Sequence, residues 1–347
     1  MKKLLINTAT DELFIVLKKD NEVFSKKISS QIHHNETMLP VLDELLNENN
    51  VLINEVDEFG VVIGPGSFTG IRVGISTIKA FRDALKAEAK GVNALDYLFA
   101  LSRNVNPKIE TVAIGGSRDS YFVAKLIHGI VYKYPRNLTL NELKEVAEGK
   151  QIGMFKHDEN LNCFVVEQNE EIFLKCVETS ADETLVPVYY QLSQAESEKL
   201  KRAEIQIEKA AIKDLKQIAE LEKENILVNT MNETQIEECL KSENYICFKA
   251  IVDDEIVGFI MLNKSDELNV DSIAVNKDFR NLGIATKLIG KAETYAKENN
   301  IATLSLEVAY KNITAYLLYK KLGFVERRTR KNYYQNGDDA IEMIKKF

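Results

Sequence analysis

The sequence is poor in the residues that build metal centres and disulfide frameworks. It has no tryptophan, five prolines, four histidines and four cysteines in 347 residues. No two cysteines have the two-residue spacing of a zinc ligand pair or a redox motif, so we expect buried free thiols. The cysteines are Cys163, Cys176, Cys239 and Cys247. We therefore expect neither a structural zinc site nor a disulfide-stabilised domain.

Long apolar runs are also missing. The first apolar stretch, residues 4–6, is too short for the hydrophobic region of a signal peptide, and no later run is long enough to cross a bilayer. We therefore expect a cytoplasmic protein without membrane contact. Acidic residues outnumber basic ones, 53 to 45, which gives a formal charge of −8. A chain with this balance is not expected to contain an autonomous nucleic-acid-binding domain.

The length and one polar stretch predict two domains. A chain of 347 residues exceeds the usual size of a single domain. Residues 191–204 contain no glycine or proline and are almost wholly polar, as in a solvated connector. We predict a first domain over residues 1–192, a linker over 193–203 and a second domain over 204–347.

The first half repeats one pattern of elements. Apolar alternation predicts strands over residues 3–7, 13–17 and 23–28, then a helix from Met38 and a buried strand over 59–63. The same order recurs with strands over 111–114, 121–127 and 130–134 and a capping box at Thr139 and Glu142. We interpret this as an internal duplication with subdomains of about 1–100 and 101–192. A three-strand meander followed by helix and strand, present twice, is the layout of the actin-like, ribonuclease-H-related ATPase fold.

A glycine-rich segment follows the strand over 59–63. The string from Gly64 to Gly70 lacks the Lys-Ser/Thr of a phosphate loop and the dinucleotide-binding spacing, so we do not interpret it as a nucleotide site. Gly66, Gly70 and Gly74 are four residues apart, which predicts a groove on a helix that lets another helix approach closely. That helix would belong to a partner subunit, or, alternatively, to the same domain.

Three strings in this half resemble one family. Residues 7–10 (NTAT), 33–40 (HHNETMLP) and 64–74 (GPGSFTGIRVG) are similar to the TsaB family. The resemblance covers roughly residues 1–195. It implies a non-catalytic actin-like domain in tRNA threonylcarbamoyladenosine synthesis that pairs with a TsaD-like subunit through the helices after Glu36 and Gly70. A TsaE-like ATPase is a further implied partner, and contact with tRNA would be only indirect.

Two departures from the family pattern concern metal chemistry. Asn7 stands where the family usually has aspartate, so a carboxylate that could orient a hydrated metal is missing. His33 and His34 are adjacent, whereas two ligands on one helical face need a spacing of three or four. We therefore expect no metal in this half. Whether it binds a nucleotide is left open.

In the second half, residues 268–299 predict a strand, a tight loop and a long helix. Apolar residues at Ile284, Leu288 and Ile289 have helical spacing. The loop over residues 280–285 (RNLGIA) places a glycine just before this helix, where free N–H groups and the positive end of the helix dipole can bind an anion such as a pyrophosphate. The alternative is an ordinary strand-to-helix turn.

The order of elements after residue 204 is β-α-α-β-β-β-α-β-α-β-β, and it resembles the GNAT acetyltransferase fold. The whole chain is thus predicted to be a mixed α/β protein. Over residues 204–347, local strings of this chain resemble most specifically the RimI family of N-acetyltransferases. The matching strings are SIAV at 272–275, LEV at 306–308, LGF at 322–324, RKNYY at 330–334 and DAIEM at 339–343.

The RimI resemblance implies an enzyme that acetylates the N-terminal alanine of a small-subunit ribosomal protein. Glu307 would be the general base and Tyr319 the general acid. The residues implied to hold acetyl-CoA are Ile273, Ala274, Val275, Arg280, Asn281, Leu282, Gly283, Ile284, Ala285, Thr286 and Asn312. No metal is implied.

Amine chemistry supports these residue types. An α-amine with a pKa of ~7.7–8.0 is partly neutral at pH 7, whereas a lysine near ~10.4 is almost wholly charged. A carboxylate that acts through water can therefore suffice for an N-terminal amine. The open alternatives are a surface role for Glu307, a core role for Tyr319 and a purely capping role for Asn312.

Two wider alternatives also stay open. The enzyme could acetylate lysine or a small amine, with the N-terminal half only a binding module. The absence of tryptophan removes an aromatic that the family often places near residues 228–231, which leaves the peptide specificity open. The basic residues Arg327, Arg328, Arg330 and Lys331 form either a solvated face or a contact with an acidic partner.

Overall fold

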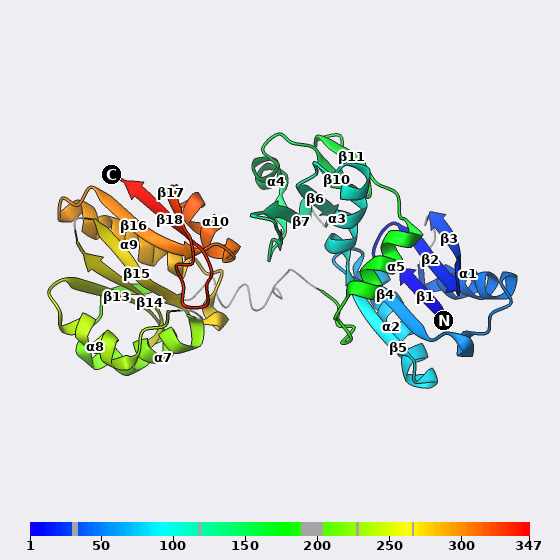
Figure 1. The fold of residues 1–347 in the computed structure, drawn as a ribbon, viewed down its shortest axis with the longest axis horizontal. Coiled ribbons are helices and arrows are strands. Elements are labelled where there is room, and N and C mark those ends of the chain that lie inside the picture. The colour runs from blue at the N-terminus through cyan, green and yellow to red at the C-terminus, as the bar shows by residue number, and fades with distance from the viewer. Residues whose placement is uncertain (30–33, 117–118, 189–203, 227–228, 266) are drawn as a thin grey trace. The chain divides into compact units, whose positions relative to one another are not determined.

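The computed structural model describes residues 1–29, 34–116, 119–188, 204–226, 229–265 and 267–347. The chain divides into two compact units, Met1–Leu192 and Ser193–Phe347 (Figure 1). The predicted linker, 193–203, lies outside the described residues. Within the described part, no helix is long and apolar enough to cross a membrane.

The N-terminal unit contains two sheets with the same topology. The elements of its first half are β1 Lys2–Asn7, β2 Glu12–Lys19, β3 Glu22–Ser29, α1 His34–Glu48, β4 Glu58–Gly64, α2 Phe68–Leu85, β5 Glu88–Asn93 and α3 Ala94–Val105. Those of its second half are β6 Thr111–Gly115, β7 Ser120–Ile127, β8 Ile130–Lys133, β9 Leu138–Thr139, α4 Leu140–Ala147, β10 Ile152–Met154, β11 Cys163–Val165 and α5 Glu170–Thr179.

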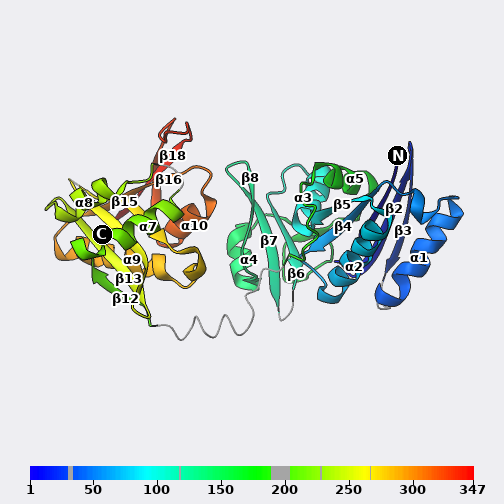
Figure 2. The same cartoon turned by 90° about the horizontal axis from the view of Figure 1, so that it is seen from below.

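The strand orders β3-β2-β1-β4-β5 and β8-β7-β6-β10-β11 are equivalent. In each sheet an antiparallel meander is extended by parallel strands, β4 and β5 in one and β10 and β11 in the other. The predicted duplication is therefore confirmed. β4 is buried along its whole length, because α2 packs on one face of the first sheet and α3 on the other (Figure 2).

The C-terminal unit has one sheet of order β12-β13-β14-β15-β16-β18-β17. Its elements are β12 Gln206–Lys209, α7 Leu215–Asn225, α8 Glu233–Lys241, β13 Tyr245–Val252, β14 Glu255–Lys264, β15 Leu268–Val275, α9 Ile284–Glu298, β16 Thr303–Ala309, α10 Ile313–Lys321, β17 Val325–Arg330 and β18 Ala340–Lys346. This is the predicted order of elements. The predicted fold class, mixed α/β, is confirmed for both units.

The sheet of this unit opens between its two parallel strands. β15 and β16 pair from Leu268↔Leu304 to Val270↔Leu306, and no further. On the other side of β15, the register with β14 shifts between Met261 and Leu262, which leaves Asp271 as an extra residue. A bulge of this kind bends a strand. The ends of β15 and β16 therefore separate beside the start of α9, and this is where the predicted site residues lie.

Candidate functional site

The loop before α9 presents free backbone amides. Gly283 has a φ of +80° and is the N-cap of α9, and the place where its Cβ would be has no atom within 4 Å. Lys287 is the first residue of this helix whose N–H reaches a carbonyl, that of Gly283, at 3.0 Å. Among the described residues, the amides of 281–286 have no acceptor. The segment can therefore bind an anion at a helix N-terminus.

The other residues predicted to hold acetyl-CoA lie at the end of β15, in the loop before α9 and at the start of α10. Arg280 Nε donates to the Val275 carbonyl at 3.2 Å, and its Nη2 donates to Asn225 Oδ1 at 2.8 Å. Its guanidinium therefore joins the end of β15 to the end of α7 as well as lying beside the loop. Ile273 and Val275 are half-buried on the part of β15 that has separated from β16, while Ala274 is buried. Asn312 caps α10, because its Oδ1 accepts from the Ala315 N–H at 3.2 Å.

Glu307 lies on β16 just after the last residue that pairs with β15. Its Oε1 accepts from Arg330 Nη1 at 2.6 Å, and its side chain is 15% exposed. Burial raises the pKa of Glu307, while Arg330 and a hydrogen bond from Asn269 act in the opposite direction. A partly desolvated carboxylate with a higher pKa is a better proton acceptor than a surface one.

Tyr319 lies on α10 and is 6% exposed. Burial raises its pKa, which keeps the phenol protonated at neutral pH, as a proton donor requires. Tyr334, in the loop between β17 and β18, is electrostatically coupled to both Tyr319 and Glu307. Burial raises the pKa of Tyr334 to about 12.

Sequence reasoning missed Glu222, which supports the same region. This α7 residue is 1% exposed. Its Oε2 accepts from Ser272 Oγ on β15 at 2.6 Å, and its Oε1 accepts from the Met231 N–H at 2.9 Å. Glu222 therefore ties α7 both to the bulged strand and to the segment before α8. It follows directly after the apolar residue Leu221, but nothing in its local pattern distinguishes it from an exposed glutamate.

The four basic residues near the C-terminus find acidic partners inside the C-terminal unit. Arg327 pairs with Glu267 and Glu342, Arg328 with Glu342, Arg330 with Glu307, and Lys331 with Asp339. The side chains of Arg328 and Lys331 are 61% and 75% exposed, so this part of the group is a solvated face whose charges are paired within the unit.

The predicted glycine groove on α2 requires correction. A Cβ on Gly66 would lie 2.1 Å from the Ala9 carbonyl oxygen, and one on Gly74 would lie 2.4 Å from Thr8 Oγ1. Gly66 and Gly74 therefore face the β1–β2 connection of the same unit, and Gly70 is buried as well. The close approach that the spacing predicted occurs within the domain, because Thr8 and Ala9 fill the space that a partner helix would need.

The helices α1 and α2 carry exposed apolar side chains, of which Phe68 also lines a cavity of this unit. Leu39 is 52% exposed and Phe68 is 56% exposed. The Arg72 guanidinium lies 3.9 Å from the centre of the Phe68 ring. The helices pack against each other. We call this the α1/α2 surface, defined by Leu39, Phe68 and Arg72.

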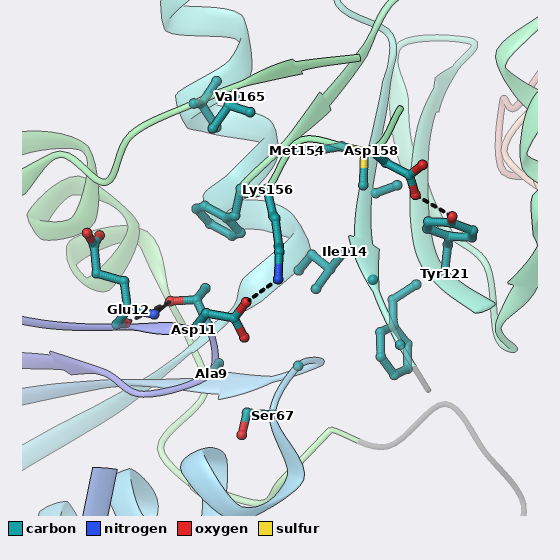
Figure 3. Close-up of a pocket in the computed structure, with 18 of the residues that line it drawn as sticks. Ala9, Asp11, Glu12, Ser67, Ile114, Tyr121, Met154, Lys156, Asp158 and Val165 are labelled. Carbon is teal, nitrogen blue, oxygen red and sulfur yellow. Dashed lines mark hydrogen bonds and ion pairs between the residues drawn. The ribbon is translucent and has the colours of Figure 1, made fainter. Parts of the chain in front are cut away.

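The N-terminal unit also contains a cavity of about 1020 Å³ between its two halves. The first half contributes the β1–β2 connection and the start of α2, and the second half contributes β6, β7 and the segment after β10 (Figure 3). Lys156 reaches across to Asp11 at 3.0 Å, and Tyr121 donates to Asp158 at 2.5 Å (Figure 3). The sequence did not predict this cavity, which is assembled from segments far apart in the chain.

Of the residues that the sequence analysis considered for metal binding in this unit, Asn7 is hydrogen-bonded within the protein, and the two histidine side chains lie outside the described part of the structure. Asn7 is buried, donates to Gln168 Oε1 at 2.6 Å and accepts from the Ala9 N–H at 2.9 Å. His33 lies outside the described residues, and only the backbone of His34 is described, at the start of α1. In the described part of the chain, no group of three or more acidic, histidine or cysteine side chains is arranged to hold a metal ion.

Known proteins resemble both parts of the chain. The model of the tRNA N6-adenosine threonylcarbamoyltransferase (TsaD) family matches residues 22–239, and that of the acetyltransferase (GNAT) family matches residues 212–324. An uncharacterised N-acetyltransferase of Methanocaldococcus jannaschii is 37% identical over 146 residues, which cover 40% of this chain and 90% of that protein.

Two further comparisons involve bacterial proteins. The ribosomal protein bS18-alanine N-acetyltransferase of Salmonella typhimurium is 35% identical over 107 residues, which cover 30% of this chain and 72% of that protein. A crystal structure from Pseudomonas aeruginosa, described as similar to the peptidase YEAZ, covers 55% of this chain and 99% of its own, with 19% identity and a TM-score of 0.44.

Proposed function

The chain belongs to the TsaD family of tRNA N6-adenosine threonylcarbamoyltransferases and to the GNAT acetyltransferase family, and we propose that its C-terminal unit acetylates the N-terminal alanine of a ribosomal protein. The match to a ribosomal protein bS18-alanine N-acetyltransferase supports this acceptor. The observation that carries the proposal is the opening between β15 and β16, which has free amides on one side and Glu307 on the other.

The residues of this opening fit acetyl-CoA. The amides of 281–286 and the open space at Gly283 suit a pyrophosphate, and the separated end of β15 borders the opening. Asn312, the N-cap of α10, is a further candidate for the cofactor. Acetyl-CoA would supply the acetyl group as a thioester. Arg280 is also a ligand candidate, although two of its nitrogens already bind Val275 and Asn225.

Two side chains would then move the protons. The neutral form of the acceptor amine would attack the acetyl carbonyl, and the Glu307 carboxylate would accept, directly or through a water molecule, the proton that this nitrogen loses as the amide forms. The Tyr319 phenol would give its proton to the departing thiolate. Its burial keeps that proton in place until the thiolate forms.

This proposal predicts that the purified protein transfers acetyl from acetyl-CoA to a peptide that begins with alanine. Because general acid–base catalysis contributes about 10²–10⁴-fold, Glu307→Gln and Tyr319→Phe should each lower kcat by about a hundredfold or more. Tyr316→Phe is a matched control on the same helix, since the Tyr316 hydroxyl binds Glu326 instead. Mass spectrometry of the peptide measures the rate.

An N-blocked lysine peptide, assayed in parallel, distinguishes the acceptor class. Faster turnover of lysine would replace the proposed α-amine acceptor by a lysine or small-amine acceptor. Unchanged rates in both the Glu307 and the Tyr319 variants would remove the catalytic assignment itself.

We further propose that the N-terminal unit is a non-catalytic partner of a TsaD-like subunit in threonylcarbamoyladenosine modification of tRNA. The family match supports this role, and the α1/α2 surface supports the place of contact, because it exposes Leu39 and Phe68 on adjacent helices. Exposed apolar side chains on one face are typical of protein interfaces. A TsaE-like ATPase would join through the TsaD-like subunit, and tRNA contact would be indirect.

A charge placed on the α1/α2 surface should weaken this pairing. We expect Leu39→Asp to lower the affinity for the TsaD-like subunit by about tenfold or more, because it would bury a carboxylate in the interface. Val105→Asp is the matched control, since Val105 is 67% exposed at the end of α3. Co-purification and calorimetry measure the pairing. Equal affinities for the two variants would contradict the proposed surface.

A further inference from the structure

Arg330 is held against Glu307 by several contacts at once. It is the last residue of β17, and its Nη1 donates to Glu307 Oε1 at 2.6 Å. Its guanidinium lies 4.8 Å from the centre of the Tyr333 ring, and its Nε is 3.9 Å from Glu342 Oε2. A planar guanidinium with an aromatic ring and a second carboxylate beside it has few other positions available.

The other groups near Glu307 include two carboxylates, and one of them, Glu342, is also paired with Arg327 and Arg328. Asn269 and Asp271 face Glu307 from β15, and Glu342 faces it from the adjacent strand β18, where the two glutamates are direct register partners. In the loop after β17, Tyr333 and Tyr334 are coupled to Glu307 as neutral phenols. Without Arg330, the negative charges of Asp271 and Glu342 would favour protonation of Glu307.

We propose that Arg330 is a positioning residue for the acetyl transfer, which holds one oxygen of Glu307 so that this side chain stays ionised and oriented toward the acceptor amine. The proposal rests on the proposed function, because it gives Arg330 no role without Glu307 as the base. In this role Arg330 acts only through Glu307, and it contacts neither the acceptor nor acetyl-CoA.

The neighbouring arginine provides a matched comparison. Arg327 also lies on β17 and also forms ion pairs, but its partners are Glu267 and Glu342. It reaches Glu342 because the register between β17 and β18 shifts between Glu326 and Arg328. Removing the charge of Arg327 therefore changes the same strand and the same ion-pair cluster without touching Glu307.

The test is the pH profile of kcat/KM for the alanine peptide in the full-length protein and its Arg330→Gln, Arg330→Lys and Arg327→Gln variants. The α-amine titrates near ~7.7–8.0 and gives one limb of the pH profile, which all variants share. A second limb at lower pH reports the protonation of Glu307. The position of that limb does not depend on how much of each variant is folded.

We expect Arg330→Gln to move the lower limb upward by about one pH unit, so that kcat/KM below it falls about tenfold relative to the parent protein. Arg330→Lys should restore most of the shift, and Arg327→Gln should leave the limb unchanged. In the Glu307→Gln background, Arg330→Gln should cause no further loss, since residues that act as a unit are not additive.

Three results would overturn the proposal while leaving the proposed function intact. One is an unmoved limb in Arg330→Gln. Another is an equal shift in Arg327→Gln, which would assign the effect to general charge. Full additivity in the double variant would give Arg330 a role independent of Glu307 and would also overturn it. Full activity of Glu307→Gln would overturn both this inference and the assignment of the base.

Discussion

At the scale of single residues, Glu222 combines deep burial with the absence of a cationic hydrogen-bond partner among the described side chains. It accepts hydrogen bonds from Ser272 Oγ and the Met231 N–H, both neutral groups. Burial raises its pKa, and these hydrogen bonds only partly offset the effect. The folded protein therefore holds a proton on Glu222 more tightly than the unfolded chain does.

The sign of the stability effect follows from linkage. A carboxyl group with a raised pKa in the folded state contributes stability below its unfolded pKa of ~4.3, and this stability is lost as the pH rises through the folded pKa. Glu222→Gln should remove that pH dependence and still satisfy both neighbours, because an amide can accept from Met231 and donate to Ser272. We expect the variant to gain stability relative to the parent as the pH rises from 5 to 8.

Removing the side chain should have a different result. Glu222→Ala leaves the Ser272 hydroxyl and the Met231 N–H without an acceptor and opens a cavity, so we expect a loss of about 2–4 kcal/mol in the free energy of unfolding at either pH. Urea unfolding of the C-terminal unit, followed by circular dichroism, measures both variants. Glu220→Gln, exposed on the same helix, is the control. A pH-independent difference between parent and Glu222→Gln would contradict the raised pKa.

At the scale of elements, periodicity predicted those parts of the fold that have one buried face. The helix α9 buries Ile284, Leu288 and Ile289 on one side, and its sequence shows that spacing. The helix α3 was not predicted, although Leu95, Leu98 and Leu101 recur at helical spacing and are buried. It lies between strands of both sheets of the N-terminal unit.

The features that complete the site depend on pairing between elements, which a local pattern does not contain. Motif and alternation singled out Glu307, but its partner Arg330 lies two strands away in the sheet, beyond β18. The bulge at Asp271 depends on the register of β15 with β14. In the same way, the spacing of Gly66 and Gly74 indicated close packing but not its direction, because Thr8 and Ala9, which fill the space, come from β1 and the turn after it.

At the scale of the whole molecule, each unit has its own hydrophobic core. In the described part of the chain, the largest cluster joins Leu4 in β1 to Leu185, entirely within the N-terminal unit. Another joins Ala210 to Ala274, entirely within the C-terminal unit. A unit with a core of its own is expected to fold without its neighbour.

We therefore predict that residues 204–347, produced alone, retain the kcat/KM of the full chain for the alanine peptide to within about twofold, since the proposed catalytic residues and their partners all lie in this range. Residues 1–192 alone should retain the affinity of the full chain for the TsaD-like subunit. Cooperative thermal unfolding of each fragment, followed by circular dichroism, is the control for folding. A folded C-terminal fragment whose activity falls tenfold and recovers when the N-terminal fragment is added would show that the two activities are coupled.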